Sequence, residues 1–285
     1  MCVKNVRLIA LDMDGTLLKS DHRTISERNI EAIRRADRAG IRVCICTGRM
    51  LEDASEFIHR LKLPCSVIAG NGTRVSDGPL PEGKILLRRR FSPQDAHRVT
   101  DLLLPYGLTI NALEDGRVST YSPDGMQSYH LVRRGVVKGC YGEAAIRSAA
   151  ERGVMKFYVA ADSSSGSKAD ARIQKARAEL RRELPHLQIT SSAPGNLEIM
   201  PAGANKGTAL AYMAQRLGLS SQEVMAMGDA QNDLSMLRYA YHSVAMANAC
   251  GEVKAVCRYQ TLSNDACGVA AMIEHVLEER EDAAG

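Results

Sequence analysis

The sequence predicts an α/β protein in which a parallel-sheet domain is interrupted along the chain by an α+β segment. Three observations indicate this fold. Short apolar runs alternate with helical patterns over residues 1–70, the alternation returns after Gly207, and the segment between them carries the turn residues of antiparallel hairpins. We therefore expect residues 1–81 and 195–285 to form one discontinuous domain, and residues 82–194 to form an inserted domain.

The first part of the chain reads as a series of βαβ units. Apolar runs predict strands at 6–11, 41–46 and 66–69. Helical spacing predicts a helix over 25–39, which ends before Gly40, and a second over 51–61. Strands joined by helices in this way form a parallel sheet.

The pattern changes after Gly72. Asp77-Gly78 and Asp115-Gly116 predict hairpin turns, and Ser92-Pro93 predicts a helix start with Ser as the cap. The expected elements of this segment are strands at 73–76, 84–87, 108–112, 118–121, 155–160, 187–191 and 197–200, helices at 92–106 and 168–184, and a flexible loop at 163–167.

The α/β alternation then returns. The expected elements are helices at 208–217, 233–239 and 270–279 and strands at 224–227 and 243–246. Gly218 follows the first of these helices as a C-terminal cap.

Composition excludes several classes of function. The chain has 285 residues, is 45% hydrophobic and 25% charged, and carries a net charge of only +4, which is ordinary for a globular protein. Basic residues cluster at 88–90 and 133–134, but with no Trp and 3 Phe the chain lacks base-stacking platforms, so we expect no nucleic-acid partner. No segment approaches the ~20 apolar residues of a membrane helix, so we expect no membrane association.

The cysteines and the N-terminus indicate the compartment. The eight cysteines include no CxxC pair, which favours reduced thiols over a metal site or a disulfide framework. The N-terminal apolar stretch is short and runs directly into Asp12, unlike a secretory signal. We expect a cytoplasmic protein.

The segment after the first strand, Asp12-Met13-Asp14-Gly15-Thr16, is the most informative motif. Side chains alternate along a strand, so Asp12 and Asp14 project to the same side where the chain leaves the sheet. At ~4 Å and an effective dielectric near 20, two carboxylates repel by roughly 4 kcal/mol, so the pair calls for a hard cation such as Mg²⁺. The Thr16 hydroxyl could hold a carboxylate in place. The alternative interpretation is an exposed Asp-rich turn.

Three further motifs follow expected strands or begin expected helices. Thr47-Gly48-Arg49 offers a hydroxyl and a backbone N–H for an oxyanion, although Thr47 could simply cap a helix. Lys206 opens a helix, where a cation opposes the macrodipole unless an anion lies beside it; the alternative is a surface lysine. The turn 228–233 is a second acidic turn, in which Asp229 could bind a metal and Asn232 and Asp233 could orient the lysine or the phosphate.

These four motifs all fall at one edge of a parallel sheet, where open α/β sheets bind ligands. A carboxylate pair, a hydroxyl, a lysine and a third carboxylate are the groups that phosphoryl transfer requires. The sequence therefore predicts an enzyme that acts on a phosphate ester.

At these residues the chain resembles the haloacid dehalogenase superfamily, most closely its Cof-type small-molecule phosphatases with a large α/β cap. The four family motifs occur in order at 12–18, 47–49, 206 and 228–233, and the segments 245–249 and 264–270 also resemble this branch. Two departures are Gly70-Asn71-Gly72, where paired Asn before Gly is common, and Asn205, where Ser is usual. The resemblance implies a Rossmann-like core domain with an inserted α+β cap domain.

The resemblance also implies roles for the motif residues. Asp12 would be the nucleophile that forms an aspartyl-phosphate, and Asp14 would be the general acid and then the general base. Mg²⁺ would be held by the side chains of Asp12 and Asp229 and by the backbone carbonyl of Asp14. The phosphoryl oxygens would be bound by Met13, Thr47, Gly48, Lys206 and Asn232, with Thr16, Arg49 and Asp233 in support.

The expected substrate is a small phosphorylated metabolite such as a sugar phosphate, and the expected assembly is a monomer or weak homodimer. A phosphomutase on a sugar phosphate is the nearest alternative within this fold. A non-catalytic ligand-binding paralogue is the alternative outside catalysis, although both Asp12 and Asp14 are present. The inserted domain would choose the substrate, but its polar residues Asp124, His130, Arg133 and Lys156 are more simply interpreted as solvated.

Overall fold

The computed structural model describes residues 3, 5–62, 65–123, 129–160, 166–192 and 195–282. The chain divides into two compact units, which we describe separately. Unit 1 consists of Met1–Leu86 and Asn205–Gly285, and unit 2 consists of Leu87–Ala204. The boundaries expected from the sequence, at 81/82 and 194/195, lie five and ten residues earlier in the chain.

Unit 1 is built on a sheet of order β14-β13-β12-β1-β2-β3-β4-β5. Its strands are β1 (Leu8–Leu11), β2 (Arg42–Cys46), β3 (Ser66–Ala69), β4 (Arg74–Ser76), β5 (Ile85–Arg88), β12 (Val224–Gly228), β13 (His242–Ala245) and β14 (Tyr259–Gln260). The six strands from β14 to β3 are parallel, and β4 is antiparallel to β3. The central strands are buried on both faces, as in parallel sheets covered by helices.

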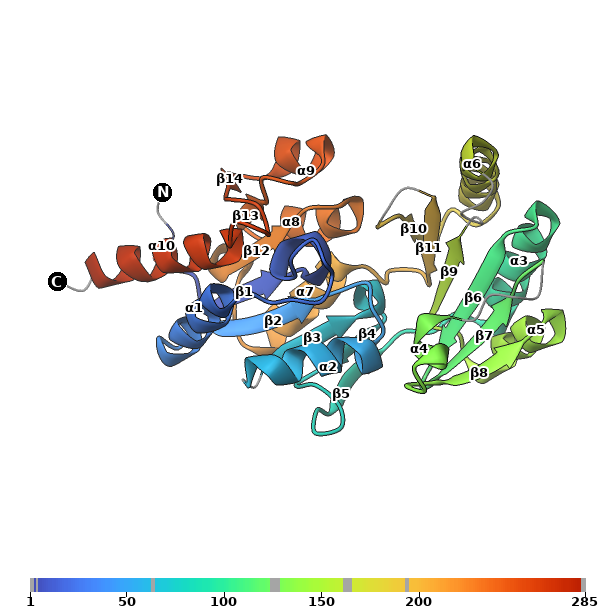
Figure 1. Cartoon of the computed structure of the whole chain (residues 1–285), viewed down its shortest axis with the longest axis horizontal. Coiled ribbons are helices and arrows are strands. Elements are labelled where there is room, and N and C mark those ends of the chain that lie inside the picture. The colour runs from blue at the N-terminus through green and yellow to red at the C-terminus, as the bar shows by residue number, and fades with distance from the viewer. Residues whose placement is uncertain are drawn as a thin grey trace. The chain divides into compact units, whose positions relative to one another are not determined.

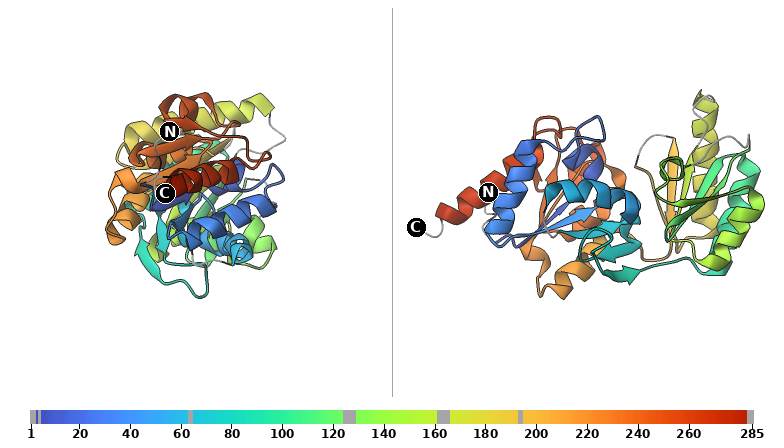
Figure 2. Two further views of the ribbon diagram at one scale, coloured as in Figure 1. Left: turned by 90° about the vertical axis from the view of Figure 1, so that its left-hand side faces the viewer. Right: turned by 60° about the horizontal axis from the view of Figure 1, so that its bottom comes forward.

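The helices of unit 1 are α1 (Glu27–Arg38), α2 (Leu51–Leu61), α7 (Lys206–Arg216), α8 (Leu234–Tyr239), α9 (Gly251–Val256) and α10 (Gly268–Asp282). α1 connects β1 to β2 and α2 connects β2 to β3, so this part of the chain moves toward one end of the sheet. α8 connects β12 to β13, which moves the chain toward the other end. Because such crossovers are right-handed, α1 and α8 cover opposite faces. α1 packs against α10, and α7 packs against α8 (Figures 1 and 2).

The register of β1 explains why residues distant in sequence meet at one edge of the sheet. β1 lies between β12 and β2 (Figure 1). Leu11 at the end of β1 is paired with Met227 of β12 on one side and with Ile45 of β2 on the other. The chain therefore leaves these three parallel strands at the same level. The motifs that begin at Asp12, Thr47 and Gly228 are placed side by side.

Unit 2 contains a largely antiparallel sheet with helices packed against it. Its strands, in the order β10-β11-β9-β6-β7-β8, are Gln188–Thr190, Asn196–Met200, Lys156–Ala160, Thr109–Glu114, Arg117–Tyr121 and Lys138–Tyr141. Its helices are α3 (Pro93–Leu103), α4 (His130–Arg133), α5 (Glu143–Arg152) and α6 (Gly166–Glu183). The described pairings are antiparallel except β7 with β8. Because β11 pairs with β9, residues 196–200 belong to this sheet and not to unit 1.

The core of unit 2 lies between this sheet and its helices. Phe91 and Phe157 meet edge to face there, with ring centroids 5.2 Å apart. On the other face of the sheet, Lys156 forms a 3.1 Å ion pair with Glu198. Lys156 is only 3% exposed, so the expectation that it is solvated is wrong: the ion pair compensates for its burial.

Other expectations for the middle segment are met only in part. His130 and Arg133 are exposed, as expected, and Asp124 lies outside the described residues. The sequence does not predict α5, whose apolar residues are mostly alanines, or the short strand β8. Residues 163–165 of the expected loop 163–167 lie outside the described residues. Its last two residues belong to α6, which begins at Gly166.

No helix in the described part of the chain is both long and apolar enough to cross a membrane.

Candidate active site

The site begins where β1 ends. Asp12 follows Leu11 in extended conformation, is 5% exposed, and its backbone N–H donates to the carbonyl of Met227 on β12. Gly15 has φ +80° and lies so close to the Asp229 carboxylate that a Cβ would collide with it. Glycine is therefore required at this position, both for the backbone conformation and for the close approach.

Lys206 is the centre of the buried charge cluster. Its Nζ lies 2.5 Å from Asp12 Oδ1 and 2.6 Å from Asp233 Oδ1, and both Lys206 and Asp233 are 0% exposed. The cation at the first position of α7 opposes the macrodipole, and these two carboxylates compensate for it. The alternative interpretation of Lys206 as a surface lysine is wrong.

The second acidic turn, after β12, is held by its own residues. Asp233 Oδ2 accepts the backbone N–H groups of Asp229 and Ala230 at 2.9 and 3.1 Å. The Thr16 hydroxyl donates to Asp229 Oδ1 at 2.8 Å, so Thr16 does hold a carboxylate in place. Asp12, Asp229 and Asp233 each have an oxygen within 4.8 Å of the others.

The electrostatics of this cluster indicate a missing positive charge. Burial raises the pKa of Asp12 well above its usual value, and the nearby Asp233 carboxylate raises it further, against the effect of Lys206. Burial and the Asp233 charge also raise the pKa of Asp229 to about 7. The pKa of Lys206 is raised, because its two carboxylate partners outweigh burial. One ammonium cannot neutralise three carboxylates, and a divalent cation would.

Asp14 has different surroundings from Asp12. Arg49 donates two hydrogen bonds to the Asp14 carboxylate, from Nε to Oδ2 at 2.7 Å and from Nη2 to Oδ1 at 2.6 Å. The ring nitrogen His22 Nδ1 lies 3.0 Å from Asp14 Oδ1. Burial acts to raise the pKa of Asp14, but the bonds and charge of Arg49, with a smaller effect of His22, leave it lowered. The two acids of the first motif are therefore distinct in environment.

Arg49 is itself anchored by α2. Its Nη1 lies 3.2 Å from the buried Asp53, and its guanidinium lies 4.5 Å from the centre of the Phe57 ring. Thr47 is not the cap of α2, which begins after Met50; instead its hydroxyl accepts the N–H of Arg49 at 3.0 Å. The interpretation of Thr47 as a helix cap is therefore wrong.

The remaining predicted residues lie at the same edge of the sheet. Met13 is fully buried, and Gly48 lies in the turn between Thr47 and Arg49. Asn232 Nδ2 donates to Asn71 Oδ1 at 3.2 Å. Asn71 is buried with φ +55°, and its N–H donates to the carbonyl of Thr47, so the loop after β3 connects two of the motifs.

Sequence reasoning does not find His22 or Asp53. Neither stands at a strand exit, and each acts through a partner that only the fold brings near. The signal for Asp53 is its position four residues after Arg49 on a helix, which is a favourable spacing for an ion pair. His22 has no comparable signal.

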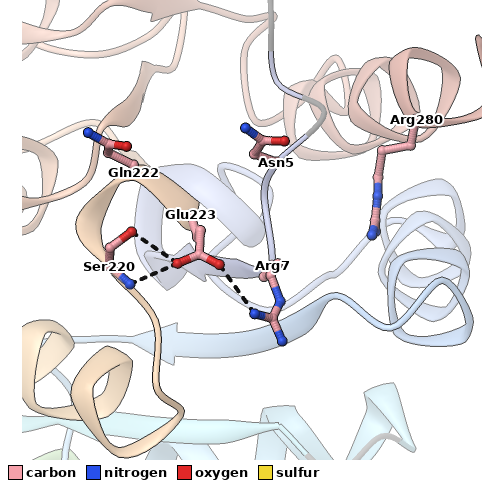
Figure 3. Close-up of a pocket in the computed structure, with 6 residues that line it drawn as sticks. All are labelled: Asn5, Arg7, Ser220, Gln222, Glu223 and Arg280. Atoms are coloured by element: carbon pink, nitrogen blue, oxygen red, sulfur yellow. Dashed lines mark hydrogen bonds and ion pairs between the residues drawn. The ribbon is translucent and has the colours of Figure 1, made fainter. Parts of the chain in front are cut away.

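A surface pocket of about 400 Å³ lies elsewhere in unit 1 (Figure 3). It is lined by Asn5, Arg7, Ser220, Gln222, Glu223 and Arg280. Arg7 and Glu223 precede β1 and β12, so the pocket lies at the amino ends of the strands, away from the acids at their carboxyl ends. Glu223 is paired there with Arg7 at 3.2 Å.

Comparison with known proteins agrees with this geometry. The family model of haloacid dehalogenase-like hydrolases matches residues 9–273. The chain is 32% identical over 277 residues to a 5-amino-6-(5-phospho-D-ribitylamino)uracil phosphatase of Bacillus subtilis, covering 95% of this chain and 96% of that protein. It is 31% identical over 269 residues to an HMP-PP phosphatase of Klebsiella pneumoniae, covering 90% and 93%.

The same family is found among solved structures. A haloacid dehalogenase-like hydrolase from Bacteroides thetaiotaomicron superimposes with a TM-score of 0.78 at 25% identity, covering 95% of this chain and 99% of that one. The fold, the family model and the named relatives agree with one another. The chain belongs to the haloacid dehalogenase-like hydrolases and, within them, to the small-molecule phosphatases.

Proposed function

We propose that the protein is a Mg²⁺-dependent phosphatase that hydrolyses a small phosphorylated metabolite, such as a sugar phosphate, through an aspartyl-phosphate on Asp12. The observation that carries this proposal is the buried cluster in which Lys206 Nζ contacts Asp12 at 2.5 Å with Asp229 nearby. Phosphoryl transfer depends mainly on positioning and on stabilising charge, and this cluster supplies both.

The reaction takes place in two displacements. First, a carboxylate oxygen of Asp12 attacks phosphorus, the bond from phosphorus to the ester oxygen breaks, and Asp14 donates a proton to that oxygen. Then Asp14 takes a proton from water as the water oxygen attacks phosphorus, which regenerates the Asp12 carboxylate and releases inorganic phosphate. Covalent catalysis divides one difficult displacement into two easier ones.

The phosphoryl oxygens require donors on the protein. We assign this role to the Lys206 ammonium, the Thr47 hydroxyl, the Asn232 amide and the backbone N–H groups of Met13 and Gly48. Arg49 is excluded from it, because its nitrogens are used by Asp14 and by Asp53. Arg49 instead pairs with Asp14 and favours its ionised form, which is the form that takes a proton from water in the second displacement.

The donor set fits a hard divalent cation. Asp233 uses Oδ1 for Lys206 and Oδ2 for two backbone N–H groups, which leaves Asp12 and Asp229 as the side-chain ligands. The backbone carbonyl of Asp14 would be the third ligand that the protein supplies to the cation. A set of oxygen ligands without His or Cys favours Mg²⁺. When bound, this ion would neutralise charge on the phosphate and on the nucleophile.

A phosphate-release screen tests the proposal. The purified protein with Mg²⁺ is offered sugar phosphates, nucleotides, flavin mononucleotide and pyridoxal phosphate, and also the phosphorylated compounds named for its relatives, 5-amino-6-(5-phospho-D-ribitylamino)uracil and HMP-PP. Asp12→Asn, which replaces the nucleophile by an amide of the same size, is the control. We expect at least one compound to release phosphate with the wild type only. No release above that control for any compound would contradict the proposal.

A further inference from the structure

The loop that follows Asp14 is held by side chains from distant parts of the chain. Residues 13–17 form an irregular turn, and the backbone carbonyls of such a segment have no partner supplied by a regular ladder. Three asparagine side chains bind carbonyls of residues 15–18. Asn248 donates to Gly15 O at 2.7 Å, Asn29 donates to Leu17 O at 3.4 Å, and Asn264 donates to Leu18 O at 2.9 Å.

The asparagines are fixed at their other ends too. Asn248 Oδ1 accepts the backbone N–H of Asn264 at 3.1 Å, and Asn29 Oδ1 accepts that of Ala270 at 3.0 Å. Each of these two amides thus accepts an N–H at its oxygen and donates to a carbonyl from its nitrogen, which leaves one orientation of the side chain. Asn29 is 0% exposed and Asn264 is 4% exposed, so water competes little for these bonds.

The same loop is attached at a further point. The backbone N–H and the hydroxyl of Ser20 both donate to Asp265, at 3.0 and 2.5 Å. Asp265 follows Asn264 directly, so one short segment before α10 binds the loop at residues 18 and 20. Asn248 belongs to the segment 245–249, and Asn264 and Asp265 belong to the segment 264–270. Both segments resemble the family but have no part in the chemistry proposed above.

Asp14 is adjacent to the first of these attachments. Its carboxylate takes two bonds from Arg49 and lies beside His22, which is carried by the same loop. The position of the carboxylate is therefore fixed on one side by α2, through Arg49, and along the backbone by the asparagines.

We propose that Asn248 and Asn264 are positioning residues for Asp14: by fixing the backbone of residues 15–18 they hold the Asp14 carboxylate where it delivers a proton to the leaving oxygen. This inference rests on the proposed function, because it assumes that Asp14 is the general acid. A misplacement of about 1 Å costs a catalytic group up to about 100-fold in rate.

The test compares two substrates that differ in their need for a proton. Phenyl phosphate releases phenolate, a poor leaving group, so its cleavage needs a proton from the general acid. The 4-nitrophenolate released from 4-nitrophenyl phosphate is a better leaving group and needs that proton much less. The measured quantity is kcat/KM, which covers the steps up to phosphoryl transfer. We expect Asn248→Ala to lower the ratio of phenyl to 4-nitrophenyl kcat/KM by about tenfold. Asn248 is exposed, so this variant should fold, and Asn264→Ala should give the same result where it folds.

Two further variants make the result interpretable. Ser243→Ala also removes a side-chain bond to a backbone N–H in unit 1, at 3.2 Å, and should leave the ratio unchanged. Asp14→Asn should lower the ratio at least as far as Asn248→Ala does. Adding Asn248→Ala to Asp14→Asn should lower it no further, because both changes act through one group.

The outcomes separate the inference from the proposed function. If Asn248→Ala lowers kcat/KM for both substrates by the same factor, the asparagine serves only the fold and the inference is overturned. A further fall in the double variant would also overturn it. If Asp14→Asn leaves the ratio at the wild-type value, or the wild type hydrolyses neither ester, the proposed function itself fails.

Discussion

Replacing Lys206 by Met should destabilise the protein in a way that depends on pH. Methionine has a similar length and no charge, so the change leaves Asp12, Asp229 and Asp233 buried without their ammonium. With oxygens within 4.8 Å of one another, each pair of ionised carboxylates repels by at least about 3.5 kcal/mol at an effective dielectric near 20. Removing one partner from a buried ion pair typically costs about 3–5 kcal/mol. For a domain of this size that corresponds to a fall in Tm of about 10 °C.

The sign of the pH dependence follows from the pKa shifts. The pKa of Lys206 is raised in the folded protein, so its stabilising contribution is complete below its unfolded value near 10 and does not change between pH 5 and pH 8. The pKa of Asp12 is also raised, and loss of Lys206 raises it further. At pH 5 the carboxylates of the variant therefore take up protons and the repulsion falls. We expect a larger loss of stability at pH 8 than at pH 5.

The assay is urea unfolding of the metal-free protein at both pH values. Lys84→Met removes an exposed lysine of unit 1 and should change the free energy of unfolding by less than about 0.5 kcal/mol at either pH. The reasoning is refuted if Lys206→Met costs less than about 1 kcal/mol at pH 8, or costs the same at both pH values.

Three other predictions concern activity, the metal and unit 2. Asp12→Asn should fold normally and lose at least about 1,000-fold in kcat, measured by phosphate release, since an amide is a very poor nucleophile; activity near that of the wild type would contradict this. The raised pKa of Asp229, about 7 in the folded state, should make the metal-free protein less stable as the pH rises from about 4 to 7. Thermal unfolding should show that Mg²⁺ or Asp229→Asn reduces this decline, to which the raised pKa of Asp12 also contributes, and a decline unaffected by both would argue against the assignment. Replacing residues 87–204 by a short linker should preserve slow hydrolysis of 4-nitrophenyl phosphate and abolish discrimination among metabolites, and an unchanged substrate ranking would place specificity in unit 1.

The sequence is sufficient to predict the parallel sheet and the motif residues. Apolar runs of fixed length followed by Asp12, Thr47 and Gly228 identify three strand exits, and parallel strands place their exits together. The position of Lys206 could be predicted because a cation at a helix start needs a nearby anion.

The roles of Asn248, Asn264 and His22 could not be predicted, because these residues act across the fold. Asn248 and Asn264 bind carbonyls more than 200 residues earlier in the chain, and His22, whose backbone adopts φ +54°, lies beside Asp14 only in the folded chain. No periodicity carries such information. In unit 2, the burial of Lys156 depends on its pairing with Glu198 on another strand, which depends on strand order and register.

The central claim is that Asp12 carries the phosphoryl group, and it can be tested directly by trapping the intermediate. Asp14→Asn should slow the hydrolysis of the aspartyl-phosphate more than its formation from 4-nitrophenyl phosphate, which needs little acid assistance. We expect a rapid burst of one equivalent of 4-nitrophenol. Borohydride reduction after rapid quenching should then convert position 12, and no other carboxylate, to homoserine, as identified by mass spectrometry of the peptide. Steady release of 4-nitrophenol without a burst and with an unmodified Asp12 would contradict the covalent mechanism.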